Sequence, residues 1–257
     1  MPSADVIDYE IVGDDLQAVI ITLDPGEACI AEAGAMMFME DGIEMATRMN
    51  LNDTGGIFGA LFKAGKRVLA GESFFITMFA NNAHERRSVG FASPYPGHVI
   101  PVQLSEHDGD LLAQRDAFLC AARGVDVDIA FNKRLGSGLF GGEGFILQRL
   151  TGDGLAMLHA GGSILRKTLG PGEALRVDTG CLVAMERTVD YDIKFVGGVK
   201  TALFGGEGLF FAYLRGPGTV WLQTLPFSRL ADRIIGLIPR SGQGSGRGIV
   251  DLLGERG

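Results

Sequence analysis

A short motif that occurs twice limits the folds open to this chain. Leu-Phe-Gly-Gly-Glu-Gly spans residues 139–144 and again residues 203–208, and an apolar stretch follows each copy. The two stretches end in Gly-rich turns, Thr-Gly-Asp-Gly and Arg-Gly-Pro-Gly. A weaker version, Leu69–Ser73, precedes the apolar stretch Ser-Phe-Phe-Ile-Thr-Met-Phe. Self-similarity of this kind indicates that one supersecondary unit is built more than once.

A second set of anchors supports three copies of the unit. A glycine followed by Glu or Asp occurs at Gly26, Gly109 and Gly172, and a small residue opens an apolar run eight positions later, at Gly34, Ala117 and Gly180. The next Gly-Glu pair follows each anchor after 45 residues (26 to 71), 33 residues (109 to 142) and 34 residues (172 to 206). The first unit therefore carries an insertion, which we place at residues 53–70.

These patterns predict an all-β chain of three tandem modules that ends in a short helix. We expect module 1 at 1–103, module 2 at 104–168, module 3 at 169–225, and a helix with a flexible tail at 226–257. The turns after the two Gly-Gly-Glu-Gly motifs predict β-hairpins. The helix is expected over Pro226–Ile238, with Ser228 as its N-cap and apolar residues at i, i+4 spacing.

Charge and composition exclude several protein classes. The formal net charge is −8, and no basic tract exceeds Lys63–Arg67, which argues against nucleic acid as a partner. The acidic start resembles no secretory signal, and no run of about 18 apolar residues occurs. We therefore expect a cytoplasmic protein, with peripheral association at the inner face of the membrane as an alternative. Cys29, Cys120 and Cys181 are widely spaced and are expected to be reduced, small hydrophobic residues.

Several segments together resemble one bacterial family. They are Pro-Gly-Glu and Glu-Ala-Gly in the first unit, Gly-Gly-Glu-Gly-Leu-Phe-Phe-Ala-Tyr-Leu-Arg-Gly-Pro-Gly-Thr-Val-Trp-Leu-Gln-Thr in the third, and the following Leu-Pro-Phe-Ser-Arg-Leu-Ala-Asp-Arg-Ile. The family is related to the yeast "altered inheritance of mitochondria" protein twenty-four and was long catalogued as a domain of unknown function. The resemblance implies three double-stranded β-helix modules in pseudo-threefold order, similar to the subunit of the trp RNA-binding attenuation protein. It also implies ring assembly, with a homotrimer of nine modules as the natural closure. Eukaryotic relatives are linked to mitochondrial inner-membrane organisation, and the family brings no catalytic residues with it.

The recurring motif itself offers little chemistry. A phosphate-binding loop needs a lysine and a following helix, and the motif has neither. Glu143 and Glu207 could act as acid and base, but they occupy equivalent places in successive modules, so we favour a structural bend. The structural set is Gly71, Glu72, Gly141, Gly142, Glu143, Gly144, Gly205, Gly206, Glu207 and Gly208. The histidines lack metal-ligand spacing, and the acidic surroundings of His107 are interpreted as a solvated turn. We expect no cofactor and no metal.

The insertion is the segment where a functional interpretation competes with a structural one. Its apolar and basic residues could contact a membrane surface or a partner: Ile57, Phe58, Leu61, Phe62, Lys63, Lys66 and Arg67. Alternatively, the insertion packs on its own ring with the cations in solvent. The sequence thus favours a non-enzymatic oligomeric scaffold or binding protein. A ring that binds a small ligand or RNA, and an enzyme using Glu143 or Glu207, stay open as alternatives.

Overall fold

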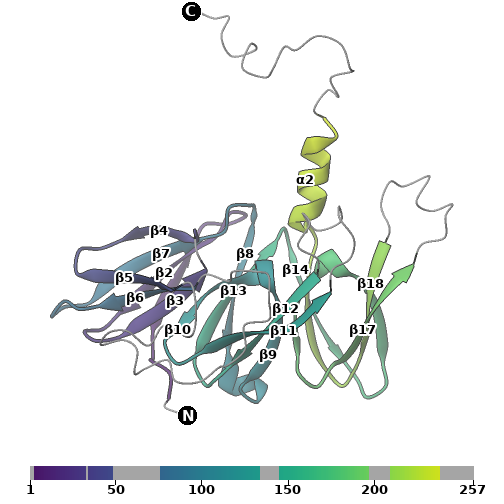
Figure 1. Cartoon of the computed structure of the whole chain (residues 1–257), viewed down its shortest axis with the longest axis horizontal. Coiled ribbons are helices and arrows are strands. Elements are labelled where there is room, and N and C mark those ends of the chain that lie inside the picture. Colours follow the sequence, from purple (N-terminus) through teal and green to yellow (C-terminus); the bar gives the residue numbers. More distant parts are fainter. Residues whose placement is uncertain (1–2, 33, 49–75, 134–144, 197–208, 238–257) are drawn as a thin grey trace, which may run out of the picture.

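The computed structural model describes residues 3–32, 34–48, 76–133, 145–196 and 209–237. Within these ranges the chain forms strands β1 to β19, three short 3-10 turns and one helix, α2. Figure 1 shows a row of β-strands with α2 projecting from it. The prediction of an all-β chain with a C-terminal helix is confirmed.

Strands β2 to β19 fall into three groups of six, numbered here in chain order, and β1 (Asp8–Val12) is an additional strand beside β2. Group 1 contains β2 (Ala18–Leu23), β3 (Ala28–Glu32), β4 (Met36–Met39), β5 (Ile43–Arg48), β6 (Ile76–Asn81) and β7 (Arg87–Ala92). Group 2 contains β8 (Gly97–Gln103), β9 (Asp110–Gln114), β10 (Phe118–Ala122), β11 (Asp126–Lys133), β12 (Phe145–Thr151) and β13 (Leu155–Gly161). Group 3 contains β14 (Ile164–Leu169), β15 (Ala174–Asp178), β16 (Leu182–Glu186), β17 (Asp190–Val196), β18 (Leu209–Arg215) and β19 (Gly218–Gln223).

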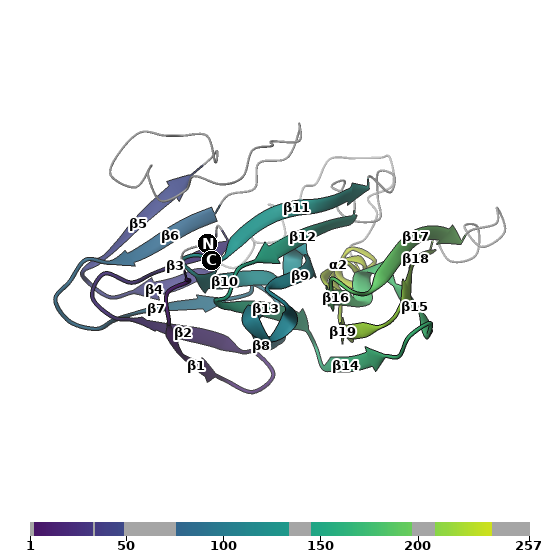
Figure 2. The ribbon, with the colours of Figure 1, turned by 90° about the horizontal axis from the view of Figure 1, so that it is seen from below.

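The three groups share one pattern of strand pairing. In each, the sixth strand lies between the first and the third, and the fifth lies between the second and the fourth, always antiparallel. Each group therefore consists of two three-stranded halves that lie in different sheets. Figure 2 shows the groups arranged side by side, with group 1 on the left and group 3 on the right.

Two strand pairs join the groups into continuous sheets, and we call each of these pairs a joint. Strand β3 of group 1 pairs with β10 of group 2, and β9 of group 2 pairs with β16 of group 3, both antiparallel. The joined sheets have the orders β5-β6-β3-β10-β13-β8 and β11-β12-β9-β16-β19-β14. The outer halves form a sheet β1-β2-β7-β4 at one end and β15-β18-β17 at the other.

The hairpins predicted after the Gly-Gly-Glu-Gly motifs are wrong, although the strands themselves are present. Strand β12 pairs with β9 and β11, while β13 pairs with β8 and β10, so the two strands on either side of the Thr-Gly-Asp-Gly turn lie in different sheets. The same holds for β18 and β19. Because both edges of the fifth strand are already occupied, the Gly-rich turn carries the chain from one sheet to the other.

The observed strands correct the sequence alignment of the three units: the anchor of the second unit lies one residue earlier than predicted. β3, β9 and β15 begin at Ala28, Asp110 and Ala174, and the following strands β4, β10 and β16 each begin eight residues later. This spacing aligns Asp108, rather than Gly109, with Gly26 and Gly172. All three have positive φ, at 55°, 87° and 77° respectively. Asp tolerates this left-handed conformation better than most side chains do, which explains how a non-glycine residue occupies the turn.

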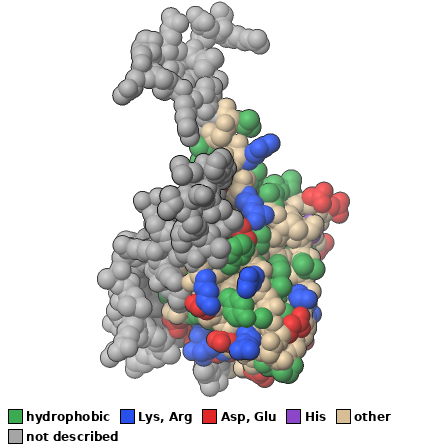
Figure 3. Space-filling view, turned by 90° about the vertical axis from the view of Figure 1, so that its right-hand side faces the viewer, with side chains coloured by type: hydrophobic (Ala, Val, Ile, Leu, Met, Phe, Trp, Pro, Cys, Tyr) green, Lys and Arg blue, Asp and Glu red, His purple; other side chains and the backbone are tan. Residues whose placement is uncertain are grey.

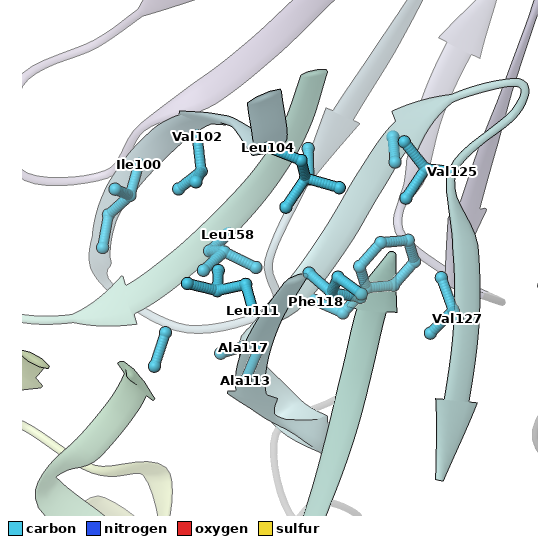
Figure 4. Close-up of a cluster of buried hydrophobic side chains, with 14 of the residues drawn as sticks. Ile100, Val102, Leu104, Leu111, Ala113, Ala117, Phe118, Val125, Val127 and Leu158 are labelled. Atoms are coloured by element: carbon cyan, nitrogen blue, oxygen red, sulfur yellow. The ribbon is translucent and has the colours of Figure 1, made fainter. Parts of the chain in front are cut away.

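Side chains on the inner faces of the strands form three apolar clusters. Figure 4 shows part of the central one, in which Leu111, Phe118 and Leu158 point toward one another from β9, β10 and β13. Each of these side chains is at most 1% exposed. Group 1 packs around Phe79 and Phe91, whose ring centroids lie 5.2 Å apart. The alternation of apolar residues in the strands thus produces three clusters, each of which also takes in residues from a neighbouring group.

Helix α2 spans Phe227–Ile235, within the predicted range. Its N-cap is Pro226 and no side chain caps it, so the prediction of Ser228 as N-cap is wrong. A proline just before a helix has a suitable φ and lacks only a backbone N–H that would have no helical partner. None of the helix residues is buried.

Candidate functional site

The site residues predicted from sequence lie outside the described residues. This applies to the insertion residues Ile57, Phe58, Leu61, Phe62, Lys63, Lys66 and Arg67, and to the motif residues Gly71, Glu72, Gly141, Gly142, Glu143, Gly144, Gly205, Gly206, Glu207 and Gly208. Their proposed roles stay predictions. Two other features of the described residues form the candidate site: a pair of strands with open edges, and a cavity beside α2.

The histidine and cysteine residues bear on metal binding. His107 does not sit in a free acidic turn: its Nδ1 lies 2.8 Å from Oε1 of Glu186, across the joint between groups 2 and 3. Among the described residues, no group of three His, Cys, Asp or Glu side chains is placed to hold a metal ion. The cysteines are free thiols, and burial raises the pKa of Cys29 and Cys120. Cys29 and Cys120 are therefore protonated thiols that pack in the interior.

The open edges belong to β4 and β15. In group 1, β4 pairs with β7 on one side only, and in group 3, β15 pairs with β18 on one side only. Their counterparts elsewhere in the chain are the joining strands: β10 and β16 correspond to β4, and β3 and β9 correspond to β15. The two ends of the row thus carry complementary halves of the joint that occurs twice inside it.

Exposure differs sharply between the open strands and their counterparts. In β10 every side chain is buried, whereas Met37, Phe38 and Met39 of β4 are 57%, 41% and 41% exposed. In β15 only Val177 is buried, whereas β9 buries its last four residues. Monomeric proteins usually protect a sheet edge with charge, proline or a covering loop, because an apolar edge invites pairing with another chain. Figure 3, which views the molecule from the group 3 end, shows basic and acidic side chains interspersed with hydrophobic ones.

A cavity of about 670 Å³ lies where the turns of groups 1 and 2 meet α2. Group 3 also contributes to the lining, through Gly180 and Gln223. The apolar part of the lining consists of Ala35 and Ala92 of group 1, Phe118, Leu119 and Ile146 of group 2, and Phe227, Ala231 and Ile235 of α2. The ring of Tyr95 stands between β13 and α2, with its centroid 4.7 Å from that of His159 and 5.4 Å from that of Phe227. Cavities of this size and apolar character are typical of small-molecule sites.

Among the charged side chains of the cavity lining, carboxylates outnumber cations. Glu32, Asp116 and Asp232 line it, and the guanidinium Nε of Arg115 lies 3.4 Å from Asp116. Burial, together with the nearby charge of Asp116, raises the pKa of Glu32 to about 7, although Arg115 opposes the shift. Burial likewise raises the pKa of Tyr95 to about 12, so its phenol stays protonated and donates a hydrogen bond of 3.3 Å to the backbone oxygen of Asp116.

His159 is the most buried ionisable side chain of the cavity lining. It is 2% exposed, and its two ring nitrogens have no hydrogen-bond partner within the described structure. Its Nε2 packs so close to β8 that a Cβ at Gly97 would lie 2.7 Å away, so only glycine fits there. Burial, and secondarily the charge of His98, lowers the pKa of His159 to about 4. The ring is therefore neutral at pH 7, with one donor and one acceptor.

Sequence reasoning missed this cavity because its residues come from all three groups and from α2. The strand that contains His159 was predicted correctly, but in the sequence His159 is only a single polar residue within an apolar stretch. The only signal was that same residue: a histidine within Leu-Ala-Met-Leu-His-Ala must either find a partner or remain unsatisfied.

No described helix is both long enough and apolar enough to cross a lipid bilayer.

Comparisons with known proteins identify relatives along most of the chain. An uncharacterized protein of Streptococcus pyogenes serotype M6 is 28% identical over 225 residues, which is 87% of either chain. A crystal structure of a Streptococcus pyogenes protein superposes with a TM-score of 0.70 at 24% identity, covering 90% of this chain and 100% of that one. This likeness supports the fold alone. A family model described as mitochondrial biogenesis AIM24 matches residues 9–225. The chain therefore belongs to the mitochondrial biogenesis AIM24 family, as the resemblance in its sequence predicted.

Proposed function

We propose that this protein is a non-enzymatic scaffold or binding protein whose copies assemble head to tail, β15 of one copy pairing with β4 of the next. One observation carries the proposal: the joint between groups occurs twice inside the chain, and its two halves are left open at the ends of the row. Pairing between copies would repeat a contact that this sequence already forms. It would also cover the exposed apolar residues of β4.

The internal joints predict the register of the contact. Ala31 of β3 faces Cys120 of β10, and Ala113 of β9 faces Ala184 of β16; in both cases the fourth residue of one strand meets the third of the other. Applied to the open edges, this rule places Val177 opposite Phe38 of the second copy. The neighbouring pair is then Arg176 and Met39.

Assembly of this kind has to close on itself or grow into a filament. We interpret each group as one double-stranded β-helix module, so three copies would place nine modules in a closed ring. Closure leaves no edge of this type exposed, which favours a ring over an open chain, and the family resemblance favours three copies in that ring. The expected mass is three times that of the 27.3 kDa chain.

Cysteine cross-linking tests both the contact and its register. In a Cys181→Ser background, Arg176→Cys combined with Met39→Cys is expected to form disulfides between copies, seen as covalent oligomers on a non-reducing gel. The matched control combines Arg176→Cys with Phe38→Cys, because adjacent strand residues point to opposite faces. Equal cross-linking of both pairs, or of neither, would contradict the proposed joint.

A membrane surface is a second candidate partner, favoured by α2. Phe227, Ile234 and Ile235 are 51%, 55% and 63% exposed, and the charged residues Arg229, Asp232 and Arg233 lie on the same helix. An amphipathic helix of this kind can lie in the interface of a bilayer. Recovery with anionic vesicles in a flotation assay should fall when Ile234→Asp is introduced, and unchanged recovery would remove α2 as a membrane contact.

A further inference from the structure

Strand β14 of group 3 is exposed at a position where its counterparts are buried. Strands β2, β8 and β14 are the first strands of their groups, and each pairs with the sixth strand of its own group. One residue in each faces the sixth-strand residue at which the register irregularity begins: Val19 in β2, Ile100 in β8 and Leu165 in β14. Val19 is 0% exposed and Ile100 is 8% exposed, whereas Leu165 is 56% exposed. Because the three residues are equivalent, the exposure of Leu165 follows from its place at the end of the row.

The buried counterparts show what β14 lacks. At both internal joints, residues of the first strand of one group pack in one apolar cluster with the third and sixth strands of the following group. The residues of these contacts are Val19 and Ile21 with Cys120 and Met157 at the first joint, and Ile100 and Val102 with Ala184 and Trp221 at the second. Group 3 is the last group of the described chain, so β14 has no following group to cover.

Group 1 keeps the position that such a contact would cover filled with apolar volume. In groups 2 and 3, a large sixth-strand residue faces a small third-strand residue. These pairs are Met157 with Cys120 and Trp221 with Ala184. In group 1 the sizes are reversed, because Gly90 faces Phe38. A Cβ on Gly90 would lie 2.3 Å from the ring of Phe38, so the ring occupies the space above the glycine. An apolar side chain is thus retained at a position that solvent reaches, which is typical of an interaction surface.

A carboxylate at the same edge repeats half of an ionic contact found at the second internal joint. Glu40 and Glu186 are equivalent, and the Oε2 of each accepts a backbone N–H bond, from Ser88 at 2.7 Å and from Thr219 at 2.8 Å. The Oε1 of Glu186 lies 2.8 Å from the Nδ1 of His107 in the preceding group. The Oε1 of Glu40 has no partner among the described residues. It is therefore available to a group from another chain.

Group 3 presents a cation at the turn that corresponds to His107. The equivalent of His107 is Pro171, which has neither a charge nor an N–H to donate. Lys167 takes the second covering position on β14, where β2 and β8 have aliphatic residues. Its Nζ lies 3.5 Å from Oε1 of Glu173, two residues after Pro171, and its side chain is 42% exposed. The ammonium group of Lys167 therefore reaches this turn and stays accessible.

We propose that β14 of one copy covers the outer face of β4 and β7 of the next copy. Leu165 packs against Phe38 above Gly90. The ammonium of Lys167 binds Oε1 of Glu40 and so replaces the imidazole of the internal contact. This inference rests on the proposed pairing of β15 with β4 and adds a contact between sheet faces to it.

The face contact determines which partner fits the open edge. Backbone pairing along β4 would accept many extended segments, because main-chain hydrogen bonds carry no sequence information. A chain that pairs with β4 and also covers its outer face must bring an apolar residue and a cation from a second strand. Group 3 of this protein does so through Leu165 and Lys167. The partner selected by this surface is therefore another copy of the same chain.

Charge reversal tests the ionic half of the contact on the full-length protein. Lys167→Glu and Glu40→Lys each bring like charges together, and we expect each to weaken association about tenfold or more, measured by sedimentation velocity over a dilution series. The double variant restores opposite charges and should associate within about threefold of the parent chain. Lys194→Glu is the matched control, because Lys194 is exposed and pairs with Asp192 on β17, the strand of its sheet farthest from β15. It should leave association unchanged.

A charge at the apolar half tests the packing of β14. The carboxylate of Leu165→Asp stays solvated in the free chain and becomes buried in the assembled one. We expect association to weaken about a hundredfold, with an unchanged circular dichroism spectrum. Val6→Asp is the control, because Val6 is 85% exposed and precedes β1, which lies at the opposite border of the sheet from β4.

The outcomes separate this contact from the pairing on which it rests. If the engineered cysteines cross-link in the expected register but Lys167→Glu and Leu165→Asp assemble as the parent chain does, the face contact is wrong and the strand pairing stands. If the parent chain is a monomer at every concentration, both are wrong. A double variant that associates as weakly as Lys167→Glu or Glu40→Lys alone would overturn the pairing of these two side chains.

Discussion

Strands β4 and β10 occupy the same position in groups 1 and 2 but meet different surroundings. Both pair with the sixth strand of their own group and show a register irregularity at the same place. Strand β10 also pairs with β3 and is wholly buried, whereas β4 has an open edge and three exposed apolar residues. The difference lies in the neighbour that each strand has, not in the strand's place in its group.

This comparison shows how the internal joints differ from the open edge. Where β3 and β9 meet a partner strand, short residues such as Cys120, Ala121 and Ala184 fill the contact. The larger Phe38 at the open position lies over Gly90, where any Cβ would clash with its ring. The following changes break or sharpen the comparison, ordered from the largest expected effect to the smallest.

A charge at the internal joint should abolish folding or come close to it. Cys120 is 0% exposed, so Cys120→Asp would bury a carboxylate without a cation and destabilise the fold by about 3–5 kcal/mol. Chemical denaturation measures the loss. Cys120→Ala, which removes the thiol without adding charge, serves as the control and should lose much less. Comparable losses from the two variants would show that the joint is not a closed apolar contact.

The same charge at the open edge should break assembly and spare the fold. Phe38→Asp is expected to weaken the contact between copies by about a hundredfold or more, because a carboxylate would become buried there. Light scattering should then report the 27.3 kDa chain, with circular dichroism unchanged. Met45→Asp, on exposed β5 outside the joint, is the control and should leave the oligomer intact. An unchanged mass for Phe38→Asp would refute the head-to-tail model.

A buried amide distinguishes the cores of groups 2 and 3. Gln148 faces Ala113 and is 0% exposed, and neither its oxygen nor its nitrogen has a partner in the described structure; the equivalent residue of group 3 is Ala212. Gln148→Met keeps a similar volume and removes the unpaired polar atoms. We expect a gain of about 1–2 kcal/mol in the free energy of unfolding. A loss of stability would mean that the amide is satisfied after all, for example by water.

The smallest effect concerns the last residue of β3 and of β15. Asp178 is paired with Arg229 at 2.7 Å, whereas Glu32 forms no ion pair within the described ranges. Because the pKa of Glu32 rises to about 7 on folding, stability is highest below its unfolded pKa and falls as the pH rises toward 7.

Glu32→Gln should therefore stabilise the protein by about 1 kcal/mol at about pH 8, after allowance for solvent screening, and have no effect in mild acid. Thermal unfolding measured across this range tests the sign. A variant that is less stable than the parent chain at about pH 8 would show that ionised Glu32 has a favourable partner.

The sequence predicted strands more reliably than it predicted their partners. Alternating apolar residues and Gly-rich turns placed β12, β13, β18 and β19 correctly. The same local pattern fits a hairpin and a crossing between two sheets equally well, because hydrogen bonding to strands far along the chain decides between them. The cavity could not be predicted for a similar reason: Glu32, His159 and Phe227 are far apart in sequence and meet only when all three groups and α2 are in place.

By itself, the sequence determined the all-β class, the C-terminal helix and the family. These depend on local propensity, on apolar periodicity and on a motif shared with relatives. Only the tertiary structure decided which strands pair, which edges stay open and that His159 is buried with no hydrogen-bond partner among the described residues. Those outcomes depend on long-range contacts: a strand has two edges, and the residues that reach them come from distant parts of the chain.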